Sequence, residues 1–287
     1  MVDCSPAASD LADQPDLKAR SPTEWDAAAY HRLSSPQIDW GHRVLARLQL
    51  GGDETVLDAG CGSGHLTACL LERLPRGRVI ALDASANMLR VAAAHLTPRF
   101  GDRVSFIQAD LQTLALRVPV DAIFSTATFH WVADHPRLFQ HLFAALVPGG
   151  RLVAQCGGGP NLDRLRCRAA TLMASPSYAP AFAGWSSPWT FADATITAEW
   201  LRAAGFVDVD TSLEPAPTVL ADADAYRDFV TAVILRDHLA ALPNEAMRAA
   251  FVATLTAQAA DDDPPFFLDY WRLNLDALRP AASGASP

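Results

Sequence analysis

The sequence predicts an α/β protein with a doubly wound, mostly parallel seven-stranded sheet and a helical cap. From residue 55 onward, short apolar segments rich in Val, Ile and Leu alternate with segments of helical periodicity. Strands of this kind are typical of parallel sheets covered by helices on both faces, because each strand is buried on two sides. After Gly157-Gly158-Gly159-Pro160 the alternation gives way to longer helical segments, which predict the cap.

Seven segments are expected to form the sheet. The first five are short and apolar, and they cover residues 55–59, 78–84, 104–110, 120–126 and 151–156. A sixth segment, 206–214, alternates between polar and apolar residues, which is typical of a half-buried strand. The seventh, 266–278, fits a closing strand, with a helix as the alternative.

Helical periodicity falls between these strands. It begins at Trp40, Val44 and Leu48, ahead of the first strand, with Pro36 near the helix start. The next helical segments cover residues 66–74, 87–96, 135–146 and 196–206, the first ending at Pro75 and the last at Gly205.

Residues 222–260 are helical throughout in pattern and are expected to form the cap. Two apolar stripes run along them, formed by Tyr226, Phe229, Val230, Val233 and Ile234 and by Met247, Phe251 and Leu255. The acidic run at 261–263 breaks the helix and is expected to be a solvated loop.

Composition excludes several classes of protein. The 287 residues carry a formal charge of −9, which argues against a nucleic-acid partner, whose phosphates need Lys and Arg. The five cysteines show no CxxC pair, so neither disulfides nor a metal site is expected. The first residues do not resemble a signal peptide, and no apolar run approaches the roughly 18 residues of a membrane span. We therefore expect a soluble, cytoplasmic protein, and its oligomeric state stays open.

A glycine cluster follows the first strand. Gly60, Gly62 and Gly64 lie between that strand and its helix, where open α/β sheets bind ligands. Asp83 ends the second strand, at a position suited to accept both hydroxyls of a ribose. The G-x-G-x-G spacing differs from that of a dinucleotide site, and Asp58 at the loop entrance would repel a pyrophosphate. These residues indicate an adenosine ligand with a cationic amine and no phosphate, which describes S-adenosylmethionine.

On these motifs the chain resembles the class I S-adenosylmethionine-dependent methyltransferases, with their Rossmann-like fold. The resemblance rests on residues 58–64, on Asp83 followed by "ASANML", on "QADL" at 108–111 and on "FSTATFHWVADH" at 124–135. The leader, the "HW…DH" segment and the late helical cap look most like the trans-aconitate methyltransferase group. Gln37 departs from that group, since a basic residue is expected there.

The resemblance implies a division of the chain and a set of cofactor contacts. It implies lid helices at 23–50, a cofactor-binding core at 51–160 and a C-terminal part at 161–280, with the substrate cap at about 220–262. The Asp, Pro, Ala and Ser content of residues 1–22 separately predicts a disordered tail. Asp58 and the three glycines would hold the methionine portion and Asp83 the ribose, although Asp83 would alternatively cap the next helix. The remaining contacts would come from Tyr30, Gln37, Trp40, Met88, Asp110, Leu111, Ser125 and Thr126, with plain core or turn roles as the alternative for Met88 and Asp110.

The acceptor side is expected after the fourth strand and in the cap. His130 is a candidate general base, and the alternatives are a hydrogen-bond donor to an anionic acceptor or a structural histidine. Trp131 would shape the pocket. Arg236, His238, Tyr270 and Arg272 are candidates to face the substrate, because arginine binds carboxylates with two parallel hydrogen bonds. The alternative for Arg236 and for Arg272 is a surface charge without a role in binding.

The sequence thus predicts methyl transfer from S-adenosylmethionine to a small molecule. An ionised carboxylic acid needs no base and fits best, giving O-methylation by in-line displacement. The alternatives are a hydroxyl, amine or carbon acceptor with His130 as base, or a protein that binds the cofactor without transfer. A nicotinamide oxidoreductase is disfavoured by the glycine spacing and Asp58.

Overall fold

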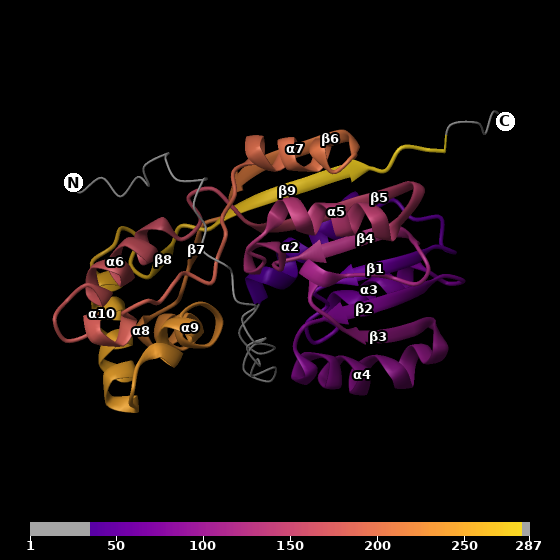
Figure 1. Cartoon of the computed structure of the whole chain (residues 1–287). Helices are drawn as coiled ribbons and strands as arrows, with labels where there is room; N and C mark the ends of the chain where they lie inside the picture. Colours follow the sequence, from indigo (N-terminus) through magenta and orange to yellow (C-terminus); the bar gives the residue numbers. More distant parts are fainter. Residues whose placement is uncertain (1–34, 283–287) are drawn as a thin grey trace.

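The computed structural model describes residues 35–282, with side chains from Asp39 onward (Figure 1). The predictions for the tail at 1–22, for residues 23–34 of the lid, for Tyr30 and for the Gln37 side chain lie outside the described part. None of the helices described there is long and apolar enough to cross a membrane.

A seven-stranded sheet forms the centre of the molecule, with the strand order β3-β2-β1-β4-β5-β9-β6. Strands β1 to β5 run parallel, and β9 is antiparallel to both of its neighbours, β5 and β6. The strands are β1 (Thr55–Ala59), β2 (Arg78–Asp83), β3 (Val104–Gln108), β4 (Val120–Thr126), β5 (Leu146–Gly157), β6 (Val207–Pro215) and β9 (Trp271–Leu278). The predicted fold class is confirmed, and so is the strand, as opposed to a helix, at the C-terminal end.

Strand order reverses at β1, which pairs with β2 on one side and β4 on the other. Ala59 at the end of β1 is paired with Leu82, and Asp83 follows it at the end of β2. The carboxyl ends of these strands therefore meet at one edge of the sheet, where a topological switch point creates a ligand crevice.

Helices cover both faces of the sheet. They are α2 (Ser35–Arg47), α3 (His65–Arg73), α4 (Ala86–Phe100), α5 (His135–Ala145) and α7 (Ala194–Ala203). Helices α2, α3 and α4 bury Val44, Leu70 and Ala92 in one cluster with Val56 of β1. Helices α5 and α7 bury a second cluster against the opposite face, which contains Leu57.

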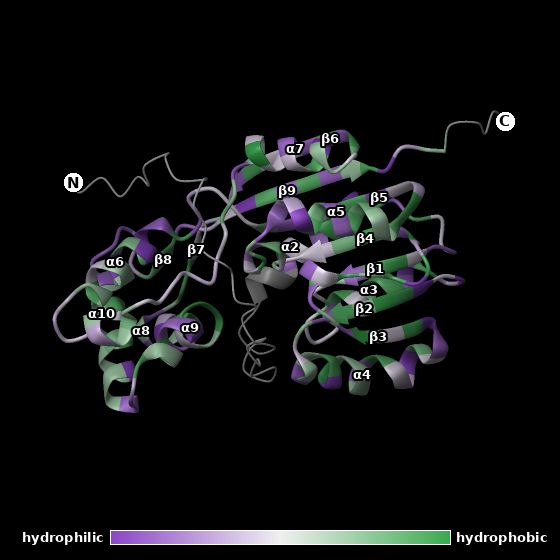
Figure 2. Cartoon of the chain, in the orientation of Figure 1, coloured by the Kyte–Doolittle hydropathy of each residue, from purple (hydrophilic) through white to green (hydrophobic). Residues whose placement is uncertain are grey.

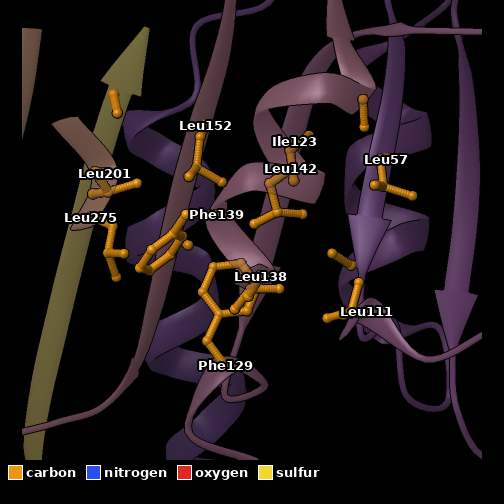
Figure 3. Close-up of a cluster of buried hydrophobic side chains, with 14 of the residues drawn as sticks. Leu57, Leu111, Ile123, Phe129, Leu138, Phe139, Leu142, Leu152, Leu201 and Leu275 are labelled. Carbon is orange, nitrogen blue, oxygen red and sulfur yellow. The ribbon is translucent and has the colours of Figure 1, made fainter. Parts of the chain in front are cut away.

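A continuous apolar strand contributes side chains to the hydrophobic clusters on both faces of the sheet. Successive residues of a strand point to opposite faces, so Val56 and Leu57 belong to different clusters. Figure 3 shows Leu138, Phe139 and Leu142 of α5 packed beside strand residues of this cluster. The strands β1 and β2 are mostly hydrophobic in Figure 2, as expected for strands buried on both sides.

The cap lies beyond the end of the sheet, on the left in Figure 1. It contains α6 (Asp163–Met173), α8 (Ala223–Phe229), the π-helical turn η5 (Val230–Ile234), α9 (Arg236–Ala241) and α10 (Glu245–Ala260). A two-stranded sheet of β7 (Thr218–Val219) and β8 (Phe267–Leu268) joins them. Both predicted stripes are buried here in part, through residues such as Tyr226 and Phe251.

The cap core also includes an earlier segment, which the sequence analysis did not assign to it. Leu162, Leu165 and Phe182 are buried together with the helices after residue 222. Helix α6 was not predicted, because its sequence, DRLRCRAATLM, is rich in arginine and buries only Leu165 and Ala169. Arginines of α6 form ion pairs with Asp262, so the helix is held by charged contacts and its sequence shows no apolar periodicity.

Asp262 corrects the expectation of a solvated acidic loop. Its carboxylate, 5% exposed, accepts hydrogen bonds at 2.6 and 2.9 Å from Arg168 and forms an ion pair at 2.9 Å with Arg164. Burial acts to raise the pKa of Asp262, but the bonds from Arg168 outweigh it and hold this pKa below its usual range. The acidic residue thus fastens α6 to the end of α10.

Candidate functional site

The glycine loop between β1 and α3 is bent by positive φ angles. Gly60, Gly62 and Gly64 have φ of 86°, 54° and 84°. A Cβ at Gly60 would collide with Thr128, and one at Gly64 would lie 2.8 Å from Leu96. At Gly62 no atom lies within 4 Å of the added Cβ. Gly60 and Gly64 are therefore needed for internal packing, whereas Gly62 is the position open to a ligand.

Asp83 fastens this loop to the end of β2. Its carboxylate accepts from the Gly62 and Ser85 amides, both at 2.9 Å. The cap of α4 is Ser85, whose hydroxyl accepts from the Met88 amide at 3.3 Å. The alternative interpretation of Asp83 as the helix cap is therefore wrong, and its carboxylate lies beside Gly62, as the ribose role requires.

Asp58 is buried at the loop entrance, with 2% of its surface exposed. The Thr67 hydroxyl donates to its carboxylate at 2.7 Å. Burial raises the pKa of Asp58 to about 7, with a further rise from the charge of Asp83 and an opposing effect of Thr67. A buried carboxylate of this kind gains from a cation placed beside it, which suits an ammonium group.

The other predicted cofactor residues have clear structural roles. The Ser125 hydroxyl donates to the Ala59 carbonyl at 2.6 Å and ties β4 to β1. Asp110 caps a short 3₁₀ turn by accepting from the Gln112 amide at 2.8 Å. Met88 and Leu111 are buried, 3% and 4% exposed. Contacts from these four residues to a cofactor stay predictions.

A pocket of about 440 Å³, partly open to solvent, lies between the end of β4 and the cap. It brings together His130, Trp131, Tyr270 and Arg272, all four predicted for the acceptor side. Arg236 is outside the lining; its guanidinium lies 6.0 Å from the Trp131 ring and 3.5 Å from Asp237. The other lining residues are Ala127, Asn161, Leu162, Trp189, Phe191, Val233 and Ile234.

Sequence reasoning missed Asn161, Trp189 and Phe191. Trp189 and Phe191 occur in "SSPWTF", where aromatic residues stand in a segment without periodicity. That combination was the available signal, since large aromatic side chains in an irregular segment need a partner surface. Their rings stack at a centroid distance of 5.7 Å and an interplanar angle of 19°. Asn161 offered no comparable signal.

His130 accepts a hydrogen bond from the backbone in this site. The Gly157 amide donates to its Nδ1 at 3.2 Å, so Nδ1 carries no proton and the neutral ring carries it on Nε2. Burial lowers the pKa of His130 well below 6.5, and the positive charge of Arg272 lowers it further. The general-base role of His130 stays a prediction, and this tautomer argues against it, because the other ring nitrogen already carries a proton.

Arg272 supplies positive charge to the pocket from β9. It is 3% exposed, and its Nη2 donates to the Asn161 side chain at 3.2 Å. Its guanidinium also lies 4.7 Å from the Trp40 ring and 5.3 Å from the Tyr270 ring. Its Nε donates to the Trp271 carbonyl at 3.1 Å, and the two aromatic rings stabilise its positive charge.

The chain matches known methyltransferases in sequence. Residues 56–150 match the family described as "Methyltransferase domain". Trans-aconitate 2-methyltransferase of Azoarcus sp. (strain BH72) is 40% identical over 131 residues, covering 46% of this chain and 50% of the relative. The enzyme of the same name from Methylobacterium nodulans is 32% identical over 244 residues, covering 84% of this chain and 91% of that protein.

The fold agrees with solved structures of low sequence identity. A phosphoethanolamine N-methyltransferase 2 of Haemonchus contortus in complex with S-adenosyl-L-methionine gives a TM-score of 0.58 at 17% identity, covering 88% of this chain and 56% of that one. A mycolic acid cyclopropane synthase complexed with S-adenosylhomocysteine gives 0.56 at 16% identity, covering 84% of both chains.

This chain belongs to the family of S-adenosylmethionine-dependent methyltransferases that includes the trans-aconitate 2-methyltransferases. The resemblance inferred from residues 58–64 and Asp83 is confirmed, and the predicted methyl donor is that of the family. The chain spans about half the length of the Azoarcus relative and most of the Methylobacterium one.

Proposed function

We propose that this protein transfers the methyl group of S-adenosylmethionine to a carboxylate oxygen of a small acid with a mostly apolar body. The observation that carries this proposal is the make-up of the acceptor pocket. One buried guanidinium, Arg272, stands beside the Nε2–H donor of His130, and most of the other lining is aromatic or aliphatic. The relatives named for trans-aconitate support a carboxylate acceptor.

Charge counting narrows the substrate class. Trans-aconitate carries three carboxylates, and burying each one requires a charged or hydrogen-bonding partner. The described lining of this pocket has a single arginine, whereas Trp131, Trp189 and Phe191 present aromatic surface. A monocarboxylic acid with a planar or aliphatic body satisfies this pocket, and a tricarboxylate leaves charges without a partner.

The cofactor half of the site fits the methyl donor. Gly62 is open on the side of its missing Cβ. Asp58 is the last residue but one of β1, and Asp83 ends the adjacent strand β2. S-adenosylmethionine, when bound, supplies an activated methyl group and takes the electron pair of the broken C–S bond onto its sulfur. Asp58 would hold its ammonium and Asp83 its ribose.

The protein's part in transfer is alignment. An acid of ordinary pKa is ionised at neutral pH, so one carboxylate oxygen forms the new O–C bond and no proton has to be removed. Arg272 and the His130 Nε2–H would hold the other oxygen and fix the direction of attack. Alignment of this kind is worth about 7–11 kcal/mol of barrier reduction. The products are a methyl ester and S-adenosylhomocysteine.

The proposal is tested by transfer of an isotopically labelled methyl group into a panel of acids, read by mass spectrometry. We expect label in aliphatic or aromatic monocarboxylic acids, in a product that releases methanol in mild base, as methyl esters do. Preferred labelling of a tricarboxylate would refute the substrate class. A base-stable labelled product would refute carboxylate methylation itself.

A further inference from the structure

Three side chains that commonly bind metals meet outside the methyl-transfer site. His42 comes from α2, and His65 and Cys69 come from α3. One ligand atom of each, a ring nitrogen or the thiol sulfur, lies within 4.8 Å of those of the other two. The lack of a CxxC pair predicted no metal site, but this cluster joins side chains of two separate helices.

Local geometry explains the cluster. His65 and Cys69 are four residues apart, and this spacing places both on one face of α3. Gly41 lets α2 approach that face, since a Cβ there would collide with the Leu66 side chain. His42, next to this contact, therefore faces the α3 pair, and its ring lies 6.1 Å from that of His65.

We propose that His42, His65 and Cys69 bind a zinc-like divalent transition metal ion that links α2 to α3. Two imidazoles and a thiolate suit zinc, whose bonds of about 2.1–2.3 Å place tetrahedral ligands about 3.5 Å apart. The exposed His42 side chain is free of the core and would move to bring the ligand atoms to that spacing. His65 and Cys69 are half-buried, which leaves the fourth position to water. The Cys69 thiol gives its proton to solvent when the metal–sulfur bond forms.

The proposed ion would lie next to both halves of the methyl-transfer site. Helix α3 begins at His65, directly after Gly64 of the cofactor loop. Helix α2 carries Trp40, whose ring packs edge-to-face against that of Tyr270 at a centroid distance of 5.1 Å. A bound ion would therefore join the helix that follows the cofactor loop to the helix that supports the acceptor pocket.

The test is a titration of the full, reduced chain with Co²⁺, a spectroscopic substitute for zinc. We expect a near-ultraviolet thiolate-to-metal band that saturates at one ion per chain and is displaced by Zn²⁺. Cys69→Ser should abolish this band, and His42→Ala should weaken Co²⁺ binding at least tenfold. Both side chains are at least partly exposed, so the variants should fold, which S-adenosylhomocysteine binding would verify.

Matched controls separate this cluster from chance binding. Cys167 is another half-buried free cysteine and His95 another exposed histidine, both distant from the cluster in sequence. Cys167→Ser and His95→Ala should leave the band and the affinity unchanged. Absence of the band, its survival in Cys69→Ser, or unchanged affinity in His42→Ala would overturn the proposal.

Discussion

The two halves of the site are built in different ways. The cofactor half comes from adjacent strand ends and one continuous loop, and its key features are backbone features: positive φ angles and amides that donate to Asp83. The acceptor half is assembled from side chains of the β4 loop, the irregular segment before α7, the cap and β9. Backbone features can bind a cofactor that a whole family shares, because they change little with sequence. Specificity for one acceptor requires side chains, which differ from one protein to another.

The largest expected effect in the acceptor half follows loss of its buried charge. Arg272→Met should lower kcat/KM for the acid about thirtyfold or more, because loss of one partner of a buried charge pair costs about 2–5 kcal/mol. Affinity for S-adenosylhomocysteine should stay near that of the unchanged protein, which also verifies folding. Steady-state kinetics and calorimetry measure the two quantities.

Arg236→Met is the matched control for that variant. Arg236 is half-buried and paired with Asp237, and it lies outside the pocket lining. We expect its kcat/KM to change by less than about threefold. Equal losses in both variants would show that general positive charge, and not the placement of Arg272, serves the acceptor.

Gly62 of the cofactor loop can be compared with Gly101, which follows α4 and serves as the control. Their φ angles are 54° and 56°, and at both an added Cβ meets no atom within 4 Å. Substitution by alanine should destabilise the fold at both positions, by about 1–2 kcal/mol at Gly62 and by more at Gly101, whose ψ of −126° lies outside the left-handed region that other residues can adopt. Only Gly62→Ala should weaken S-adenosylhomocysteine binding, by about tenfold or more. Equal affinities by calorimetry would contradict the ligand-facing role of Gly62.

Asp58 should make cofactor binding depend on pH. Its pKa of about 7 in the free protein should fall when an ammonium binds beside it, so binding is favoured by the ionised form. Affinity for S-adenosylhomocysteine should therefore decrease about tenfold from pH 8 to pH 6, as the carboxylate takes up a proton. Asp58→Asn should weaken binding at pH 8 and abolish this dependence. Calorimetry at both pH values measures these affinities. Equal affinity of the unchanged protein at pH 6 and pH 8, or a pH dependence that survives in Asp58→Asn, would contradict this role of Asp58.

The raised pKa of Asp58 also makes the stability of the folded protein depend on pH. Because the pKa of Asp58 in the folded state is above its unfolded value, its contribution is most favourable at low pH and is lost as pH rises through about 7. Asp58→Asn should therefore raise the melting temperature of the ligand-free protein at pH 8, with a smaller gain at pH 6. A lower melting temperature at pH 8 would contradict the cost that we assign to burial.

The contrast between the halves explains what the sequence could predict. The strand–helix alternation predicted the sheet, and the spacing of Asp58, Gly62 and Asp83 predicted the family, because these residues lie within one short stretch of chain. Helix α6, Asn161 and the role of Asp262 depend on contacts between residues about 100 positions apart, which no local pattern encodes. The tautomer of His130 was equally hidden from the sequence, since the Gly157 amide that donates to its Nδ1 lies 27 positions away, at the end of β5.

On our proposal, the acceptor half orients the already ionised carboxylate of the substrate, and His130 is not a general base. The most direct test is kcat/KM for the acid between pH 6 and pH 8.5, at saturating S-adenosylmethionine. We predict a flat profile, because burial lowers the pKa of His130 well below its ordinary value of 6.5. We predict a similarly flat but lower profile for His130→Gln, which keeps an N–H donor. A profile that rises with pH through one ionisation, and loses that rise in His130→Gln, would contradict the account.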